Sequence, residues 1–208
     1  MFFTIEEEKL EEEIVEKKSK FIGTLFYITS EEQAQEILKK IKKQYYDARH
    51  NCFAYRVMTE NGIVERFSDD GEPSGTAGGP MLNILNKNNL CNVLIVVTRY
   101  FGGILLGTGG LVRAYSDATT KVIESATLAN ETMGAEVEVV IDYNELELLK
   151  YYCKNNNLNI VNTVYENNIK CYIEVTQEEL ERLIDKNNNN CNILEYKVIE
   201  KRNIRKTL

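Results

Sequence analysis

Glycine and proline are concentrated in one short part of the sequence. Nine of the 12 glycines and both prolines lie between residues 71 and 110 of the 208-residue chain. Glycine adopts backbone conformations that other residues avoid, at a cost in entropy, so such clustering is typical of tightly constrained loops. The pattern predicts two loops of defined conformation in the first two thirds of the chain, separated by regular structure.

The first loop, residues 66–80, combines carboxylates, hydroxyls and glycines. One interpretation is a surface loop in which Asp, Ser and Gly simply make turns. The other is a ligand loop, because loops of this length are uncommon unless they are functional or disordered. We favour a functional loop, without choosing its chemistry.

Two chemistries suit this first loop. Backbone amides at Ser74, Gly75 and Thr76 can form a concave nest for an anion. Its carboxylates can instead hold Mg²⁺ or receive a basic partner. These carboxylates belong to Asp69, Asp70 and Glu72. Whether they bind magnesium stays open.

The second loop, residues 99–110, lies between a predicted apolar strand and a predicted helix. Phosphates and carboxylates are often held at such a helix N-terminus. It is neither a Walker loop, which needs Gly-Lys-Ser/Thr, nor the dinucleotide fingerprint. Close packing of helix on strand explains the glycines equally well. The candidate residues are Gly102, Gly103, Gly107, Thr108, Gly109 and Gly110.

Arginines flank both loops, whereas lysine dominates elsewhere in the first 134 residues. Arginine makes bidentate contacts with carboxylates and phosphates, so these positions are candidate ligand contacts. Ion pairs with aspartates of the same region are the structural alternative. The arginines are Arg49, Arg56, Arg66, Arg99 and Arg113. If a strand ends near residue 98 and a helix begins near residue 109, we expect the two loops to meet at one rim.

His50 is the single histidine of the chain, and Asn51 follows it. As a catalytic base it would need Cys52 or Ser74 as the nucleophile. A lone histidine in such a sequence more often organises hydrogen bonds, so we predict a structural or binding role and no catalytic residue.

The first two thirds mix strands and helices. We expect an opening strand pair within residues 6–16, a strand at 21–28 and a helix at 30–46 capped by Ser30 with Gln33. A hairpin follows (50–57 and 63–67, turning at 60–62), then a short helix from Pro80, a buried strand at 92–98 and a helix at 109–125. This order predicts an α+β layer spanning residues 1–134.

The last third, residues 135–208, reads as a separate domain. Alternating apolar and polar residues predict strands at 135–143, 158–165, 169–175 and 193–200. Asn144 is the expected cap of one intervening helix, and Thr176 with Glu179 forms a capping box for another. Asparagines at 187–190 are expected to end that second helix. The order βαββαβ is the split, ferredoxin-like pattern.

Composition excludes several classes of function. Five widely spaced cysteines without a Cys-x-x-Cys pair predict free thiols and no zinc site, and no cofactor is expected. A net charge of −7 means that nucleic acid could bind only at a local basic patch. No apolar run is long enough for a membrane span, and the N-terminus lacks the order of a signal peptide. We expect a cytoplasmic protein of unknown oligomeric state.

Three motifs occur in a defined order: DARHNCFAY at 47–55, SDDGEPSGTAG at 68–78, and VTRYFGG at 97–103 with residues 106–115. Together they resemble the YigZ/IMPACT family, and the segment SKFI at 19–22 also agrees. The resemblance covers nearly the whole chain. It implies a first domain with the fold of ribosomal protein S5 domain 2 and a ferredoxin-like second domain, similar to the last domain of elongation factor G.

Eukaryotic members of this family restrain an amino-acid-starvation kinase by competing for its activator on ribosomes. The resemblance therefore implies a role linked to translation. We expect a non-enzymatic binding protein whose partner is the ribosome, an RNA or a translation factor. The alternative is a small-molecule enzyme or an anion-binding protein that uses the two glycine-rich loops.

Overall fold

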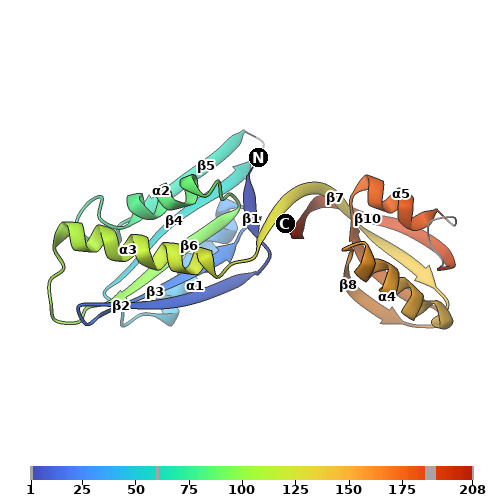
Figure 1. Cartoon of the computed structure of the whole chain (residues 1–208), viewed down its shortest axis with the longest axis horizontal. Coiled ribbons are helices and arrows are strands. Elements are labelled where there is room, and N and C mark those ends of the chain that lie inside the picture. Colours follow the sequence, from blue (N-terminus) through green and yellow to red (C-terminus); the bar gives the residue numbers. More distant parts are fainter. Residues whose placement is uncertain (1, 60, 186–190, 208) are drawn as a thin grey trace. The chain divides into compact units, whose positions relative to one another are not determined.

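The computed structural model describes residues 2–59, 61–185 and 191–207. The chain has an α+β architecture with antiparallel strand pairs, and it divides into two compact units, each described here by itself (Figure 1). The first extends to Asn130, and the second comprises Glu131–Lys206. None of the described helices is both long and apolar enough to cross a membrane.

The first unit is a central sheet with helices on both faces. Its elements are β1 (Phe3–Ile5), β2 (Lys9–Glu16), β3 (Ser19–Tyr27), α1 (Glu31–Gln44), β4 (His50–Thr59), β5 (Gly62–Ser68), α2 (Gly78–Lys87), β6 (Val93–Tyr100) and α3 (Gly107–Glu124). The sheet order is β2-β3-β6-β4-β5, and every neighbouring pair is antiparallel. Helices α2 and α3 cover one face, and α1 covers the other (Figure 1).

Burial of β6 on both faces explains its continuous apolar sequence. Val93, Ile95 and Val97 pack in the core that includes α2 and α3, while Leu94 and Val96 pack in the core that includes α1. A central strand covered on both sides needs apolar residues at every position rather than at alternate ones. This is the strand that the sequence predicts at residues 92–98.

Strand pairing brings the ends of several strands to one edge of the first unit. Lys20 pairs with Tyr100, and His50 pairs with Arg99, so β6 ends where β3 and β4 begin. Strand β5 also ends there, because Ser68 pairs with Phe53 near the start of β4. Both glycine-rich loops leave the sheet at this edge, one after β5 and one after β6.

The second unit has the strand and helix order that the sequence predicts. Its elements are the end of β7 (Leu128–Ile141), η1 (Tyr143–Glu145), α4 (Leu146–Asn155), β8 (Asn159–Tyr165), β9 (Ile169–Val175), α5 (Gln177–Ile184) and β10 (Ile193–Thr207). Strand β7 pairs with β9 and β10, and β9 pairs with β8. Both helices pack against one sheet face in a single apolar core. The five cysteines are free, as predicted, and all five are buried.

Local sequence signals locate the starts of two helices accurately and are less accurate at the others. Ser30 Oγ accepts from the Gln33 amide, and Thr176 forms the predicted capping box with Glu179. Asn144, however, lies in the 3₁₀ turn η1, and α4 begins after Glu145 without a side-chain cap. The short helix α2 begins two residues before Pro80.

The predicted opening strand pair is wrong. Strands β1 and β2 do not pair with each other: β1 pairs with the start of β7, and β2 pairs with β3. Residue 60 of the predicted hairpin turn and the turn at 187–190 lie outside the described residues.

Candidate functional site

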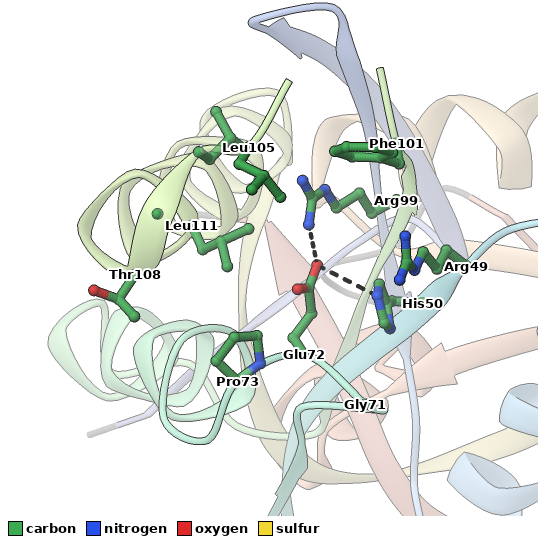
Figure 2. Close-up of a pocket in the computed structure, with 12 residues that line it drawn as sticks. Arg49, His50, Gly71, Glu72, Pro73, Arg99, Phe101, Leu105, Thr108 and Leu111 are labelled. Atoms are coloured by element: carbon green, nitrogen blue, oxygen red, sulfur yellow. Dashed lines mark hydrogen bonds and ion pairs between the residues drawn. The ribbon is translucent and has the colours of Figure 1, made fainter. Parts of the chain in front are cut away.

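A pocket of about 340 Å³ lies at the sheet edge where the two glycine-rich loops leave the first unit (Figure 2). Its lining comes from three places in the sequence: the start of β4, the loop after β5, and the loop after β6 with the first turns of α3. The lining residues are Arg49, His50, Gly71, Glu72, Pro73, Arg99, Phe101, Leu105, Leu106, Gly107, Thr108 and Leu111. The structure therefore brings the two loops together at one pocket.

The floor of the pocket is a buried ion pair between Arg99 and Glu72. Arg99 Nη1 donates to Glu72 Oε1 at 2.6 Å, and the Tyr115 hydroxyl donates to the same oxygen at 2.9 Å. Arg99 is only 5% exposed, and its Nε is buried without a hydrogen-bond partner among the described residues. Burial raises the pKa of Tyr115, so this hydroxyl stays a donor. Glu72 thus neutralises Arg99 and is itself held by the hydrogen bond from Tyr115.

His50 lies beside this pair, and its hydrogen bonds define its orientation. Nδ1 is 2.8 Å from the carbonyl oxygen of Asp70, which can only accept, so Nδ1 carries a proton. Nε2 then faces Glu72 Oε1 at 3.9 Å, as the dashed line in Figure 2 shows. The ring is fixed in the pocket wall, and its second nitrogen is directed toward the pocket.

Asp69 has a structural role that bears on both chemistries considered for the first loop, the anion nest and the magnesium site. Its carboxylate accepts from the amides of Gly75, Ala77 and Gly78 at 2.8–3.0 Å. The amide of Thr76 donates to the Pro73 carbonyl. The loop amides that the sequence offers to an external anion are therefore largely occupied, and the anion they bind is Asp69 itself. This arrangement also supplies α2 with the N-terminal acceptor that Ala77 lacks.

Asp70 is likewise used within the fold. Its carboxylate accepts from the backbone amide of Asn51 and pairs with Lys42, while Asn51 Oδ1 accepts from Thr98. The carboxylates of Asp69, Asp70 and Glu72 thus bind three different sets of partners within the fold. In the described part of the chain, no group of three or more His, Cys, Asp or Glu side chains is arranged to hold a metal ion.

The rim of the pocket combines a cation with apolar surface. The guanidinium of Arg49 lies 5.7 Å from the ring centroid of Phe101, and that of Arg99 lies 5.6 Å from it. Arg49 is exposed and has no ion-pair partner among the described residues. Leu105, at the mouth, is 83% exposed. The rim therefore offers a positive charge next to an aromatic face and an aliphatic side chain.

The N-terminus of α3 forms another part of the wall. The cap residue, Leu106, has no side-chain acceptor for the first-turn amides, and the first turn holds no acidic residue. Gly107 and Thr108, at the start of this turn, line the pocket. The N-terminal amides and the helix dipole favour negative charge there.

Gly102 is required by packing and not by ligand binding. Its amide donates to Ser19 Oγ, and a Cβ at this position would lie 2.0 Å from the backbone of Lys18. Gly103, which has φ of +84°, follows it in the turn out of β6. Neither glycine lines the pocket, and nor do Gly109 and Gly110.

Three of the five loop-flanking arginines are also absent from the pocket lining. Arg66 is exposed on β5 and pairs with Glu31 at 3.7 Å. Arg113 is exposed on α3. Arg56, which also flanks a loop in sequence, is buried and donates to the carbonyl of Leu90. Proximity to a loop in sequence thus identifies Arg49 and Arg99 but not the other three. Ser74, Gly75 and Thr76 lie in the first loop outside the lining.

Cys52 does not have the environment of a nucleophile. Its thiol is buried, donates to the Asp69 carbonyl at 3.0 Å and contacts the Tyr115 hydroxyl. Burial raises the pKa of Cys52 to about 12, so the thiolate is absent near neutral pH.

Sequence reasoning missed the apolar part of the site. Phe101, Leu105 and Leu111 line it, but their apolar character reads as ordinary core sequence. The available signal was the run of large apolar residues inside a glycine-rich loop, where a purely structural turn would hold small or polar residues. Tyr115, one turn further along α3, has no local signal.

Comparison with known proteins covers both units. The Impact N-terminal domain matches residues 17–123, and the domain of unknown function DUF1949 matches residues 139–192. The first match spans the β2–β3 turn, both glycine-rich loops and nearly all of α3, so the whole pocket lies inside it.

Bacterial relatives match most of the chain. The IMPACT family member YvyE of Bacillus subtilis is 39% identical over 178 residues, which are 86% of this chain and 81% of that protein. The IMPACT family member YigZ of Escherichia coli is 36% identical over 72% of this chain and 74% of that protein. A crystal structure described only as that of a hypothetical protein is 28% identical, covers 96% of this chain and 97% of that one, and has a TM-score of 0.61. The chain belongs to the IMPACT family.

Proposed function

We propose that this chain is a non-enzymatic, cytoplasmic binding protein linked to translation regulation, and that it contacts RNA on the ribosome through the pocket edge of its first unit. Membership of the IMPACT family supports the link to translation. In the same proposal, residues 1–134 form a domain like ribosomal protein S5 domain 2, and residues 135–208 form a ferredoxin-like domain. The strand order β10-β7-β9-β8, with helices after β7 and β9, supports the second assignment.

The observation that carries the RNA contact is a group of three exposed cations at the pocket edge: Lys17, Lys18 and Arg49. The β2–β3 turn places the backbone of Lys18 beside Gly102, which follows Phe101 of the rim, and Lys17 is the other residue of this turn. None of the three has an ion-pair partner among the described residues. Since the whole chain has a net charge of −7, such a local group of cations is what attraction to phosphate requires.

Three carboxylates near this edge are engaged by other groups of the fold, so they do not pair with the three exposed cations. Glu72 pairs with Arg99, Asp70 pairs with Lys42, and Asp69 is surrounded by backbone amides. We favour binding over catalysis because the groups that could act as a nucleophile or a paired acid and base are committed to these structural contacts. Cys52 and Asp69 are the clearest examples.

Ribosome co-sedimentation tests this proposal. We expect the full chain to sediment with ribosomes at low salt. Its affinity for ribosomes should fall about tenfold or more at moderate salt, because phosphate contacts release counterions. The double variant Lys17→Glu/Lys18→Glu should remain in the supernatant. Lys39→Glu/Lys40→Glu, which makes the same charge change on the exposed face of α1, should sediment as the wild type does. Absence of the wild type from ribosomal fractions at both salt concentrations would overturn the proposal.

A further inference from the structure

We infer that the pocket binds the terminal phosphate monoester of an RNA chain, with the adjoining base on the apolar rim. This inference rests on the proposed RNA contact and names the part of the RNA that the site recognises. It begins from the shape of the site. The pocket of about 340 Å³ is at the lower end of ligand-pocket volumes, and it has room for a phosphate with its sugar.

The charges of the lining favour an anion with a high charge density. Arg99 is neutralised by Glu72, so these two groups form a polar floor. Arg49 adds an unpaired positive charge at the rim, and the uncapped N-terminus of α3 adds amide donors at the opposite wall. A phosphate monoester carries up to two charges and three acceptor oxygens near neutral pH. An internal phosphodiester carries a single charge and would have to leave the pocket at both ends.

His50 presents one defined ring nitrogen to this anion site. Since its Nδ1 proton is held by the Asp70 carbonyl, Nε2 is the nitrogen available inside the pocket. Figure 2 shows His50 and Arg49 on the same side of the pocket, with Leu105, Leu111 and Thr108 opposite them.

The apolar rim accounts for recognition of a nucleotide over inorganic phosphate. Phe101 is 39% exposed, and its ring already lies beside two guanidinium groups. Unstacked bases at the ends of RNA stack on aromatic and guanidinium planes of this kind. Leu105, exposed at the mouth, provides aliphatic contact with the same base. The pocket thus places a phosphate site and a stacking surface next to each other.

The test measures how short oligoribonucleotides bind to the full chain by fluorescence anisotropy. One oligonucleotide carries a 5′-phosphate, a second carries a 3′-phosphate, and a third has hydroxyl groups at both ends. We expect a phosphorylated end to bind at least about tenfold more tightly than the hydroxyl-ended RNA, because charged hydrogen bonds are gained. Comparison of the first two oligonucleotides identifies the end that is recognised. Equal affinity for all three would overturn the inference.

Variants locate the effect in the pocket. Thr108→Glu places a carboxylate at the helix N-terminus, where it competes with phosphate while helping the helix. This variant should melt at or above the wild-type temperature and should bind all three RNAs with the hydroxyl-end affinity. Arg49→Ala removes the rim charge and should reduce the preference for phosphate. Arg113→Ala, an exposed arginine on α3 outside the lining, should keep the full preference. A preference that persists in Thr108→Glu would overturn the inference.

Failure of this inference and failure of the proposed function give different results. If the chain sediments with ribosomes but does not distinguish RNA ends, the terminal-phosphate inference is wrong and the ribosomal contact stands. If purified RNA ends are distinguished but ribosomes are not bound, the terminal-phosphate site stands and the ribosomal proposal is wrong.

Discussion

Arg99 and Glu72 are 27 positions apart in sequence and form a buried ion pair, with Nη1 donating to Oε1 at 2.6 Å. The two residues come from the two glycine-rich loops, one from the end of β6 and the other from the loop after β5. Phe21 lies under the Arg99 guanidinium at 5.4 Å. Because the contact ties both loops to the sheet, it shapes the pocket before any ligand arrives.

Replacement of Arg99 by alanine should destabilise the chain strongly. Glu72 would be left as a buried carboxylate without its cation, which typically costs about 3–5 kcal/mol. We expect Arg99→Ala to lower the urea midpoint accordingly, as followed by circular dichroism. Arg113→Ala, on the exposed face of α3, should change stability by no more than about 0.5 kcal/mol. Equal small losses in both variants would show that the pair is not a structural contact.

Asp69 should also be a stability residue, although it lies in a loop. Asp69→Ala removes the acceptor of three backbone amides at the start of α2, and we expect a loss of about 3 kcal/mol. Asp69→Asn retains one oxygen acceptor and should lose less. Asp117→Ala, an exposed carboxylate on α3, is the matched control. The order of the three melting temperatures checks this prediction, and an Asp69→Ala chain as stable as Asp117→Ala would contradict it.

Two glycines of the second loop should respond to alanine in opposite ways. At Gly102 a Cβ would lie 2.0 Å from the Lys18 backbone, so Gly102→Ala should displace the turn after β6 or prevent folding. At Gly109 there is no atom within 4 Å of a Cβ, and the residue is helical. Gly109→Ala should therefore raise stability by about 0.5 kcal/mol. Thermal melts of the two variants provide the comparison, and equal effects would refute the packing explanation.

The cysteines should make the chain sensitive to alkali. Burial raises the pKa of Cys52, Cys153 and Cys191 to about 12, above the value of 9.0 for an exposed thiol. In the folded state these thiols keep protons that the unfolded chain releases, so their contribution is complete below pH 9 and is lost as pH rises toward 12. We expect the free energy of unfolding to fall over that interval, more gently in a Cys153→Ala chain.

Thiol reactivity provides an independent measurement of the same burial. At pH 8, a disulfide reagent such as Ellman's should react slowly with the native chain, because all five cysteines are buried. The same reagent should react with all five after denaturation. Rapid reaction of Cys52 in the native chain would contradict its assignment as a buried, structural thiol.

Local chemistry in the sequence predicts most of the regular structure. The apolar run that becomes β6, the alternation that becomes β9, and the caps at Ser30 and Thr176 are each decided by neighbouring residues. The glycine-rich loops are also visible, because a positive φ, as at Gly71 or Gly107, favours glycine regardless of distant contacts. Errors occur where a distant partner decides the outcome, as for β1, which pairs with β7.

The roles of charged residues in the site depended on tertiary structure. Asp69 and Glu72 are both acidic loop residues in the sequence, yet one binds backbone amides and the other neutralises Arg99. Arg99 near the end of β6 and Arg113 in α3 both flank the second loop, yet Arg113 is exposed and Arg99 forms the pocket floor. The register between β4 and β6 places His50 opposite Arg99. Short-range preferences of the backbone determine where strands, helices and turns form, whereas the partner of a charged side chain depends on which distant segments the sheet brings within hydrogen-bonding distance.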